Sequence, residues 1–192
     1  MRFEAIVVGV SAGGWQALHR ILPGLPATFP TPMLIVQHMA PSSDDYLARS
    51  LNDFCALTVK EADEKEIIRQ GYIYTAPANY HLLVEQNRTF SLSTRATVNY
   101  TRPSIDVLFE TAADTYGSHL IGIVLTGASH DGSRGLLEIK KAGGLTIVQD
   151  PRTAEAPFMP QSAIDMVPVD YILPLDGIIP FLAALVSTRT LK

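Results

Sequence analysis

Two kinds of hydrophobic pattern alternate along this chain: short apolar runs, and stretches in which apolar residues recur every three or four positions. Three of the runs, at 4–10, 33–38 and 120–125, are typical of strands buried on both faces. The stretches between them have the spacing of helices that cover a sheet. The pattern therefore predicts an α/β fold, a three-layer sandwich with a mostly parallel sheet and helices on both faces.

The rest of the chain fits the same arrangement. Shorter strands are predicted near 57–60 and at 72–75, 145–148 and 170–173, and helices over 14–22, 43–54, 102–116, 133–142, 160–166 and 176–188. Ser42 or Ser43 is expected to cap the second helix, and Arg102-Pro103-Ser104 to open the third. The segment 81–93 predicts a small antiparallel hairpin insertion. Because no long linker divides the chain, residues 1–192 are expected to form a single domain.

Composition narrows the class of protein. Hydrophobic residues make up 47% of the 192 residues, which suits one globular core, and the net charge of −4 argues against a nucleic-acid partner. No apolar run approaches the roughly 18 residues of a membrane span and no secretory signal is visible, so a cytoplasmic location without membrane insertion is expected. The single cysteine, Cys55, excludes an internal disulfide and a cysteine-based zinc site, and the histidines lack metal-ligand spacing. Neither a metal nor another cofactor is expected.

The first predicted strand ends in a Gly-x-Ser-x-Gly segment centred on Ser11 and leads directly into a helix. This turn exposes a serine at the edge of a sheet, where it can act as a nucleophile. Two other interpretations are an ordinary helix N-cap and a degraded dinucleotide-binding motif. The second requires an acidic residue at the end of the next strand, where Gln37-His38 stands, so the nucleophile hypothesis is favoured.

Two more chemically useful residues follow strands of the predicted sheet. His38 ends the second strand, and Asp131 follows the strand at 120–125. Ligands of an open α/β sheet bind beyond the carboxyl ends of its strands. We therefore expect Ser11, His38 and Asp131 to meet as nucleophile, base and orienting carboxylate. The alternatives are a structural His38 and an Asp131 that only caps a helix, while His130 competes as the base although neighbours in a turn usually diverge.

Backbone N–H groups near Ser11 are predicted to hold the oxyanion of an acyl-transfer reaction. The amide of Ala12 directly follows the nucleophile, and the amide of Ala128 lies in the turn that carries Asp131. One donor of this kind is typically worth about 3 kcal/mol of transition-state stabilisation. The N-terminus of the helix after Ser11 acts in the same direction.

Six separated segments of the chain carry motifs in a fixed order: 8–14, 36–39, 74–77 with 81–82, 102–109, 125–132 and 159–164. Together they resemble the catalytic domain of the chemotaxis receptor methylesterase family, the CheB type. The resemblance covers nearly the whole chain.

That family hydrolyses γ-glutamyl methyl esters on the cytoplasmic helices of chemoreceptors, and some members deamidate glutamines there. The resemblance assigns the family's serine, histidine and aspartate to Ser11, His38 and Asp131, and implies a protein-glutamate methylesterase whose partners are methylated chemoreceptor helices. Arg102 is a candidate substrate contact. The family often carries an N-terminal receiver domain, whereas this chain starts at the first catalytic strand. No receiver domain is therefore expected in this chain. A separate receiver protein is a candidate partner, and the alternatives are constitutive activity and a domain excised from a longer protein.

The turn that carries Asp131 departs from the family pattern. Where the family usually has Thr-Gly-Met-Gly-x-Asp-Gly, residues 126–132 read Thr-Gly-Ala-Ser-His-Asp-Gly. Ser129 would be strained if its position required a positive φ. The departure motivates an alternative function, a catalytically weakened module that binds a signalling partner through the same surface. A third hypothesis is an esterase for other acyl substrates, because loops rather than the scaffold set the substrate class.

Overall fold

Seven parallel strands form the central sheet in the computed structural model, which describes residues 3–187. Their order across the sheet is β3-β4-β2-β1-β7-β8-β9. These strands are β1 (Ala5–Val10), β2 (Met33–Gln37), β3 (Thr58–Glu61), β4 (Tyr72–Thr75), β7 (Leu120–Val124), β8 (Leu145–Gln149) and β9 (Tyr171–Leu173). A separate antiparallel hairpin is formed by β5 (His81–Val84) and β6 (Phe90–Ser93). The predicted parallel sheet and hairpin insertion are confirmed.

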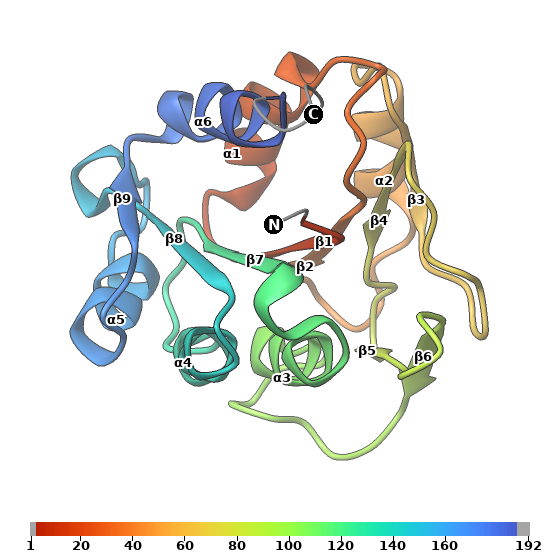
Figure 1. Ribbon diagram of the computed structural model, residues 1–192. Coiled ribbons are helices and arrows are strands. Elements are labelled where there is room, and N and C mark those ends of the chain that lie inside the picture. The colour runs from red at the N-terminus through yellow and green to blue at the C-terminus, as the bar shows by residue number, and fades with distance from the viewer. Residues whose placement is uncertain (1–2, 188–192) are drawn as a thin grey trace.

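Helices cover both faces of this sheet, as Figure 1 shows. The α-helices are α1 (Gly14–Ile21), α2 (Tyr46–Asn52), α3 (Ile105–Tyr116), α4 (Ser133–Lys141), α5 (Phe158–Met166) and α6 (Leu175–Ser187). Short 3₁₀ helices span Leu22–Gly24, Gly117–His119 and Pro151–Thr153. The predicted three-layer sandwich is therefore also confirmed. Within residues 3–187, no helix is long and apolar enough to cross a membrane.

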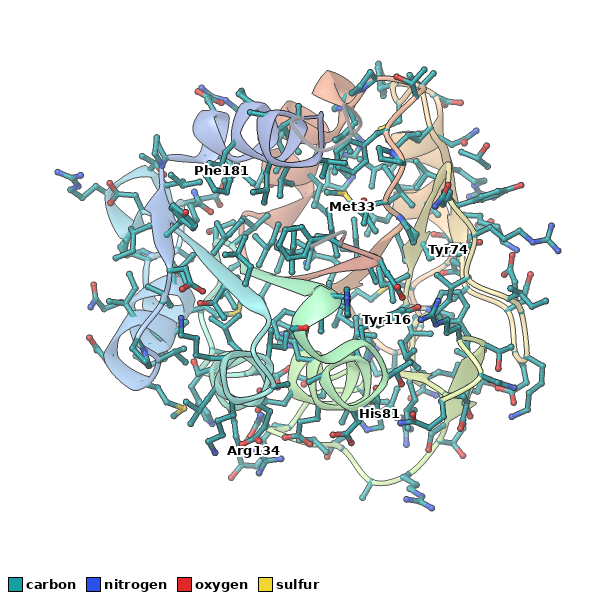
Figure 2. The ribbon with its side chains drawn as sticks, viewed as in Figure 1. Met33, Tyr74, His81, Tyr116, Arg134 and Phe181 are labelled. Carbon is teal, nitrogen blue, oxygen red and sulfur yellow. The ribbon has the colours of Figure 1, made fainter. Side chains whose placement is uncertain are left out.

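Each face of the sheet has its own hydrophobic core. Successive side chains of β1 point to opposite faces, so Ile6 packs with α1, α2 and α6 while Val7 packs with α3, α4 and α5. Figure 2 labels Met33, which belongs to the first core, and Tyr74 and Tyr116, which belong to the second. All six positions of β1 are buried. This explains why the central strands are continuous apolar runs rather than alternating ones.

The second helix starts later than the sequence predicted. It begins at Tyr46 and its N-cap is Asp45, so the expected cap at Ser42 or Ser43 is wrong. The carboxylate of Asp44 accepts a hydrogen bond from the Tyr46 amide at 3.2 Å, a local bond that competes with helix formation just before the helix.

The third helix also starts later, at Ile105, with Ser104 as its N-cap. The Ser104 hydroxyl makes no capping hydrogen bond and instead donates to Asp131 Oδ1 at 2.8 Å. This hydrogen bond connects the start of α3 to Asp131, one of the predicted site residues.

The path of the chain brings three strand ends together. From β1 the chain passes to β2 and then to β3 at the edge of the sheet. It returns to β4, between β3 and β2, and later crosses to β7 on the other side of β1. The carboxyl ends of β2, β1 and β7 therefore lie side by side at a topological switch point, the usual ligand position in an open α/β sheet.

Candidate active site

Ser11 stands in the tight turn between β1 and α1. Its amide donates to the carbonyl of Thr126 at 2.9 Å, and its own carbonyl accepts from the amide of Gly14 at 2.9 Å. Gly13, the N-cap of α1, has φ +75°, a left-handed conformation that favours glycine. The glycines of the motif thus serve the turn that holds Ser11 at the rim.

The register of the sheet places His38 beside Ser11. Val10 and Gln37 are partners across β1 and β2, and the next residues along the two strands are Ser11 and His38. Neighbouring strands lie about 4.8 Å apart, so the two main chains run in contact at this point. The His38 amide donates to the carbonyl of Val10 at 3.0 Å.

Gln37 ties the same two residues together. Its side-chain Nε2 donates to the carbonyl of Ser11 at 3.0 Å and to the carbonyl of His38 at 2.8 Å. A Cβ at Gly14 would lie 2.1 Å from Gln37 Oε1, so only glycine leaves room for this amide. In the sequence, Gln37 indicates only that a dinucleotide site is absent; its contacts with Ser11 and His38 were not predicted.

His38 contacts the carboxylate that the sequence predicted. Its Nε2 lies 2.8 Å from Asp131 Oδ2, and the side chains are 10% and 0% exposed. The other ring nitrogen, Nδ1, makes no hydrogen bond within the described chain and can accept one from a neighbouring hydroxyl. In the described chain no hydrogen bond joins Ser11 Oγ to His38, and catalytic hydrogen bonds of this kind often tighten only when substrate binds.

Besides His38, Asp131 is held by donors from the 98–101 turn and from the start of α3. It accepts from the side chains of Asn99 and Ser104, each at 2.8 Å, and from the amides of Ile105 at 2.6 Å and Asp106 at 3.2 Å. The last two amides open α3, so the positive end of a helix faces the carboxylate.

These contacts determine the charge of Asp131. Burial favours the neutral carboxyl, but hydrogen bonds from His38, Asn99 and the Ile105 amide outweigh it and lower the pKa of Asp131 to about 2. The carboxylate is therefore ionised at neutral pH and can orient His38 and stabilise its charged form.

A second buried carboxylate, Asp106, lies behind the first. Burial raises the pKa of Asp106, and the negative charge of Asp131 raises it further. Hydrogen bonds from the Gly135 and Gly132 amides and from Asn99 lower the pKa, but they do not cancel the rise. Asn99 Nδ2 donates to both carboxylates, to Asp106 Oδ2 at 2.9 Å and to Asp131 Oδ1 at 2.8 Å. It shares one amide group between two acidic side chains.

Sequence reasoning missed Asn99 altogether. It lies in a turn whose ends, Val98 and Thr101, pair in an isolated antiparallel β-bridge. Both Asn99 and Tyr100 have a positive φ, +52° and +63°. A non-glycine pair in this conformation costs energy and is found where surrounding contacts enforce it, commonly at functional sites. No sequence pattern indicated that this turn reaches Asp131.

The two predicted oxyanion donors are available. Among the described residues, neither the Ala12 amide nor the Ala128 amide donates a hydrogen bond to another residue, and both residues are exposed. Ser129 does not have a positive φ, and its hydroxyl accepts from the Asp131 amide at 3.2 Å. The altered turn is thus compatible with a serine at this position.

Two other candidates from the sequence take different positions. His130 is exposed and, within the described chain, makes no hydrogen bond with Asp131, so His38 holds the contact expected of the base. The guanidinium of Arg102 donates to the side chain of Asn79 and to the carbonyls of Thr94 and Arg95. These contacts tie together loops beside the hairpin.

Comparison with known proteins decides the family. A family model described as CheB methylesterase matches residues 6–182. The chain belongs to the CheB methylesterase family. The crystal structure of the Thermotoga maritima CheB methylesterase catalytic domain has a TM-score of 0.91 to this chain at 36% identity, and the match covers 96% of this chain and 100% of that one. The family and fold that the motifs indicated are confirmed.

Relatives of this CheB-type chain carry names that state an activity. A Leptospira interrogans protein named "Putative protein-glutamate methylesterase/protein-glutamine glutaminase" is 54% identical over 178 residues, which are 93% of this chain and 92% of the relative. A Borreliella burgdorferi protein named "Probable protein-glutamate methylesterase" is 41% identical over 187 residues, 96% of this chain and 50% of the relative. Protein-glutamate methylesterases are carboxyl-ester hydrolases.

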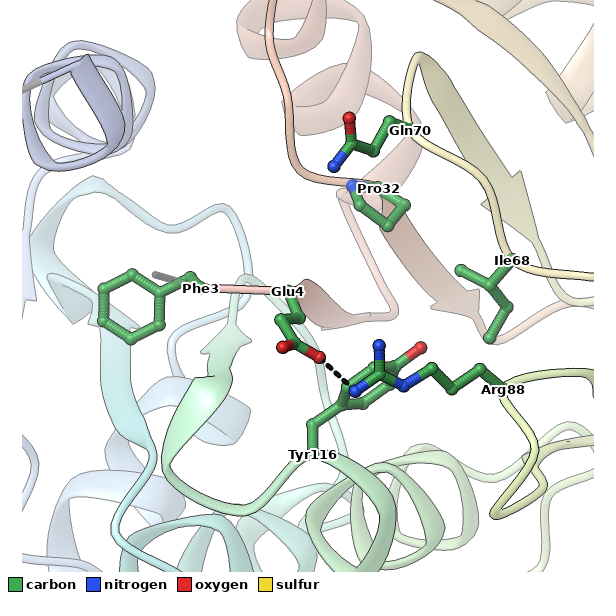
Figure 3. A pocket seen from close by; sticks show the side chains of 7 residues that line it. All are labelled: Phe3, Glu4, Pro32, Ile68, Gln70, Arg88 and Tyr116. Atoms are coloured by element: carbon green, nitrogen blue, oxygen red, sulfur yellow. Dashed lines mark ion pairs between the residues drawn. The ribbon is translucent and has the colours of Figure 1, made fainter. Parts of the chain in front are cut away.

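Two of the cavities in the described chain, each of about 250 Å³, lie at opposite ends of the sheet. One is a groove that includes His38 and Met39 in its lining. The other lies near the amino ends of the strands, where Arg88 forms an ion pair with Glu4 at 2.5 Å and lies over the ring of Tyr116 (Figure 3). Of these two, the first adjoins the CheB-type site. Among residues 3–187 no group of three or more acidic, histidine or cysteine side chains is placed to hold a metal ion.

Proposed function

We propose that this protein is a protein-glutamate methylesterase that hydrolyses γ-glutamyl methyl esters on the cytoplasmic helices of chemoreceptors. The observation that carries the proposal is the 2.8 Å contact between the buried Asp131 carboxylate and His38, at a strand end next to Ser11. The names of the relatives from Leptospira and Borreliella support the substrate class. Glutamine deamidation is the related reaction, because an amide differs from the ester only in its leaving group.

In the first half-reaction, Ser11 Oγ attacks the γ-carbonyl carbon and its proton passes to Nδ1 of His38. The carbonyl oxygen takes the negative charge and accepts hydrogen bonds from the amides of Ala12 and Ala128. The bond to the methoxy oxygen then breaks, His38 returns the proton to that oxygen, and methanol leaves. An acyl-serine remains.

In the second half-reaction, a water attacks the acyl-serine and gives a proton to His38. The bond to Ser11 Oγ breaks, the serine recovers its proton, and the γ-carboxyl group of glutamate is released. Asp131 holds Nε2 of His38 throughout, which fixes the tautomer that presents Nδ1 to the serine and stabilises the imidazolium. The N-terminus of α1 adds favourable potential at Ser11.

We further propose that residues 1–192 act as a single catalytic domain in the cytoplasm and that a receiver protein is among its partners. The seven-stranded sheet, with a hydrophobic core on each face, supports one folding unit. Apart from one water, the proposed reaction uses only side chains and amides of this chain, so the proposal includes no cofactor.

The test is methanol release from a methylated receptor fragment. The wild-type protein is expected to release methanol, and Ser11→Ala to release none above background. The matched control is Ser162→Ala, which removes an α5 hydroxyl that donates to the Phe158 carbonyl, and it should retain full activity. Binding of the receptor without methanol release by the wild type would support the alternative, a signalling-partner module. A strong preference for simple aryl esters would support a general esterase.

A further inference from the structure

An apolar groove opens directly beside His38. Its walls include Trp15 at the start of α1 and Tyr46 at the start of α2, and Met39 and Leu47 also line it. Because His38 lines the same groove, whatever occupies it sits next to the base. The cavity, of about 250 Å³, has room for side chains but does not enclose a large molecule.

Trp15 is fixed in place although it is 43% exposed. One face of its indole stacks on the imidazole of His19, with ring centres 3.8 Å apart. That imidazole is held at both nitrogens, by the carbonyl of Trp15 at 2.8 Å and by the hydroxyl of Ser50 on α2 at 2.8 Å. An exposed aromatic ring with a rigid backing loses little conformational entropy on binding, which is a property of strong interface residues.

Other large exposed aromatic side chains gather at this edge. Tyr46 is 57% exposed, and Tyr100, in the strained turn beside Asp131, is 96% exposed. Exposed tyrosine and tryptophan are typical of surfaces that bind protein partners. Exposed aromatic side chains thus occur both in the groove beside His38 and in the turn beside Asp131, which fits a protein substrate better than a small ester.

Charge on the rim restricts the occupant. Asp44 and Asp45 stand at the start of α2, and among residues 3–187 the cation that pairs with them is Arg49, at 3.2 and 3.0 Å. Two carboxylates against one guanidinium leave a net negative rim. An apolar side chain is accepted at such a groove, whereas an ionised glutamate is repelled.

We propose that the Trp15–Tyr46 groove is the docking subsite for the helix that carries the ester, and that it holds an apolar side chain one helical turn away from the esterified glutamate. The inference rests on the proposed function and names its substrate contact. Side chains three or four residues apart on a helix lie about 5–6 Å from each other on one face. A helix that presents its ester to Ser11 and His38 thus projects a neighbouring side chain into the groove.

The first experiment measures methanol release from a methylated receptor fragment by Trp15→Ala and Tyr46→Ser, with Ile67→Ala as the matched control. Ile67 is 55% exposed, lies between β3 and β4 and does not line the groove. We expect each groove variant to lower kcat/KM for the receptor fragment at least tenfold more than for a short N-acetylated glutamate γ-methyl ester. The loss should come from a higher KM for the receptor, with kcat nearly unchanged. The control should match the wild type. Tyr46→Ser keeps the test valid if Trp15→Ala proves unstable, and thermal unfolding monitors both.

The second experiment changes the substrate. In helical peptides with one esterified glutamate, an apolar residue three or four positions away is replaced by glutamate or by glutamine. Glutamate is expected to lower kcat/KM at least tenfold and glutamine less. The docking proposal would be overturned if the groove variants lost kcat/KM equally on the receptor and on the short ester, or if the peptide replacements did not change kcat/KM. In either case, methanol release by the wild type would still support the proposed function. No release by the wild type overturns both.

Discussion

Replacement of Asp131 by asparagine tests the electrostatics of the site through protein stability. The carboxylate is fully buried and ionised, and its pKa falls from the ordinary 3.8 to about 2. One pKa unit is worth about 1.36 kcal/mol. The contacts from His38, Asn99 and the start of α3 therefore stabilise the folded protein by roughly 2 kcal/mol when the carboxyl is ionised in both states.

The sign of the pH dependence follows from the direction of the shift. Because the folded pKa lies below the unfolded one, this stabilisation is fully present above about pH 4 and is lost as the pH falls through about 2. Asp131→Asn lacks the charge at every pH. The free energy of unfolding of this variant is therefore expected to be lower than that of the wild type by roughly 2 kcal/mol or more at pH 7. This difference should shrink by at least half by about pH 2.

The assay is urea denaturation followed by circular dichroism between neutral pH and about pH 2, analysed by linear extrapolation. Asp165→Asn is the control, because Asp165 is exposed and, in the described chain, hydrogen-bonds only Gln161 on its own helix. The free energy of unfolding of Asp165→Asn should stay within about 0.5 kcal/mol of the wild-type value over the whole pH range. An Asp131→Asn deficit that does not change with pH, or that is no larger than the control at pH 7, would refute the reasoning.

Four further outcomes are expected. Gly14→Ala places a Cβ 2.1 Å from Gln37 Oε1, so it should destabilise the fold by about 1–3 kcal/mol and lower kcat at least tenfold, measured by denaturation and methanol release. Ala128→Pro removes one oxyanion donor and should lower kcat about 100- to 1000-fold with little change in KM, whereas Ala128→Gly should stay close to wild type. Arg102→Met should lower the thermal midpoint by several degrees while KM for the receptor stays within twofold, because the guanidinium is engaged by loops. Burial raises the pKa of the Cys55 thiol to about 11, so iodoacetamide at pH 7.5 should modify Cys55 at least 100-fold more slowly than free cysteine, as followed by mass spectrometry.

The fold was predictable because its strongest signals are local. The runs that became β1, β2 and β7 are continuous and apolar since both faces of the sheet are covered, and the glycines around Ser11 indicate its turn directly. Helix starts were less predictable. The side chain of Asp44 accepts a hydrogen bond from the Tyr46 amide, and α2 begins only at Tyr46. Several polar residues compete for such local hydrogen bonds, so the sequence alone does not indicate where the helix begins.

The candidate site was predictable only for residues at strand ends. His38 and Asp131 could be brought together by sheet topology, and the structure shows their contact, while the catalytic roles stay a prediction. Asn99 and Gln37 could not be found in this way. The contacts of Asn99 depend on a loop that crosses from the hairpin to α3, and those of Gln37 depend on the spacing between two main chains. Neither leaves a periodic signal in the sequence.

The most direct test of the central claim is to map the residue that a fluorophosphonate modifies, by peptide mass spectrometry, and to measure the rate. The account predicts one adduct, on Ser11, formed at least 100-fold more slowly in His38→Ala and in Asp131→Asn than in the wild type. An adduct on another residue, or equal rates of Ser11 modification with and without His38, would contradict it.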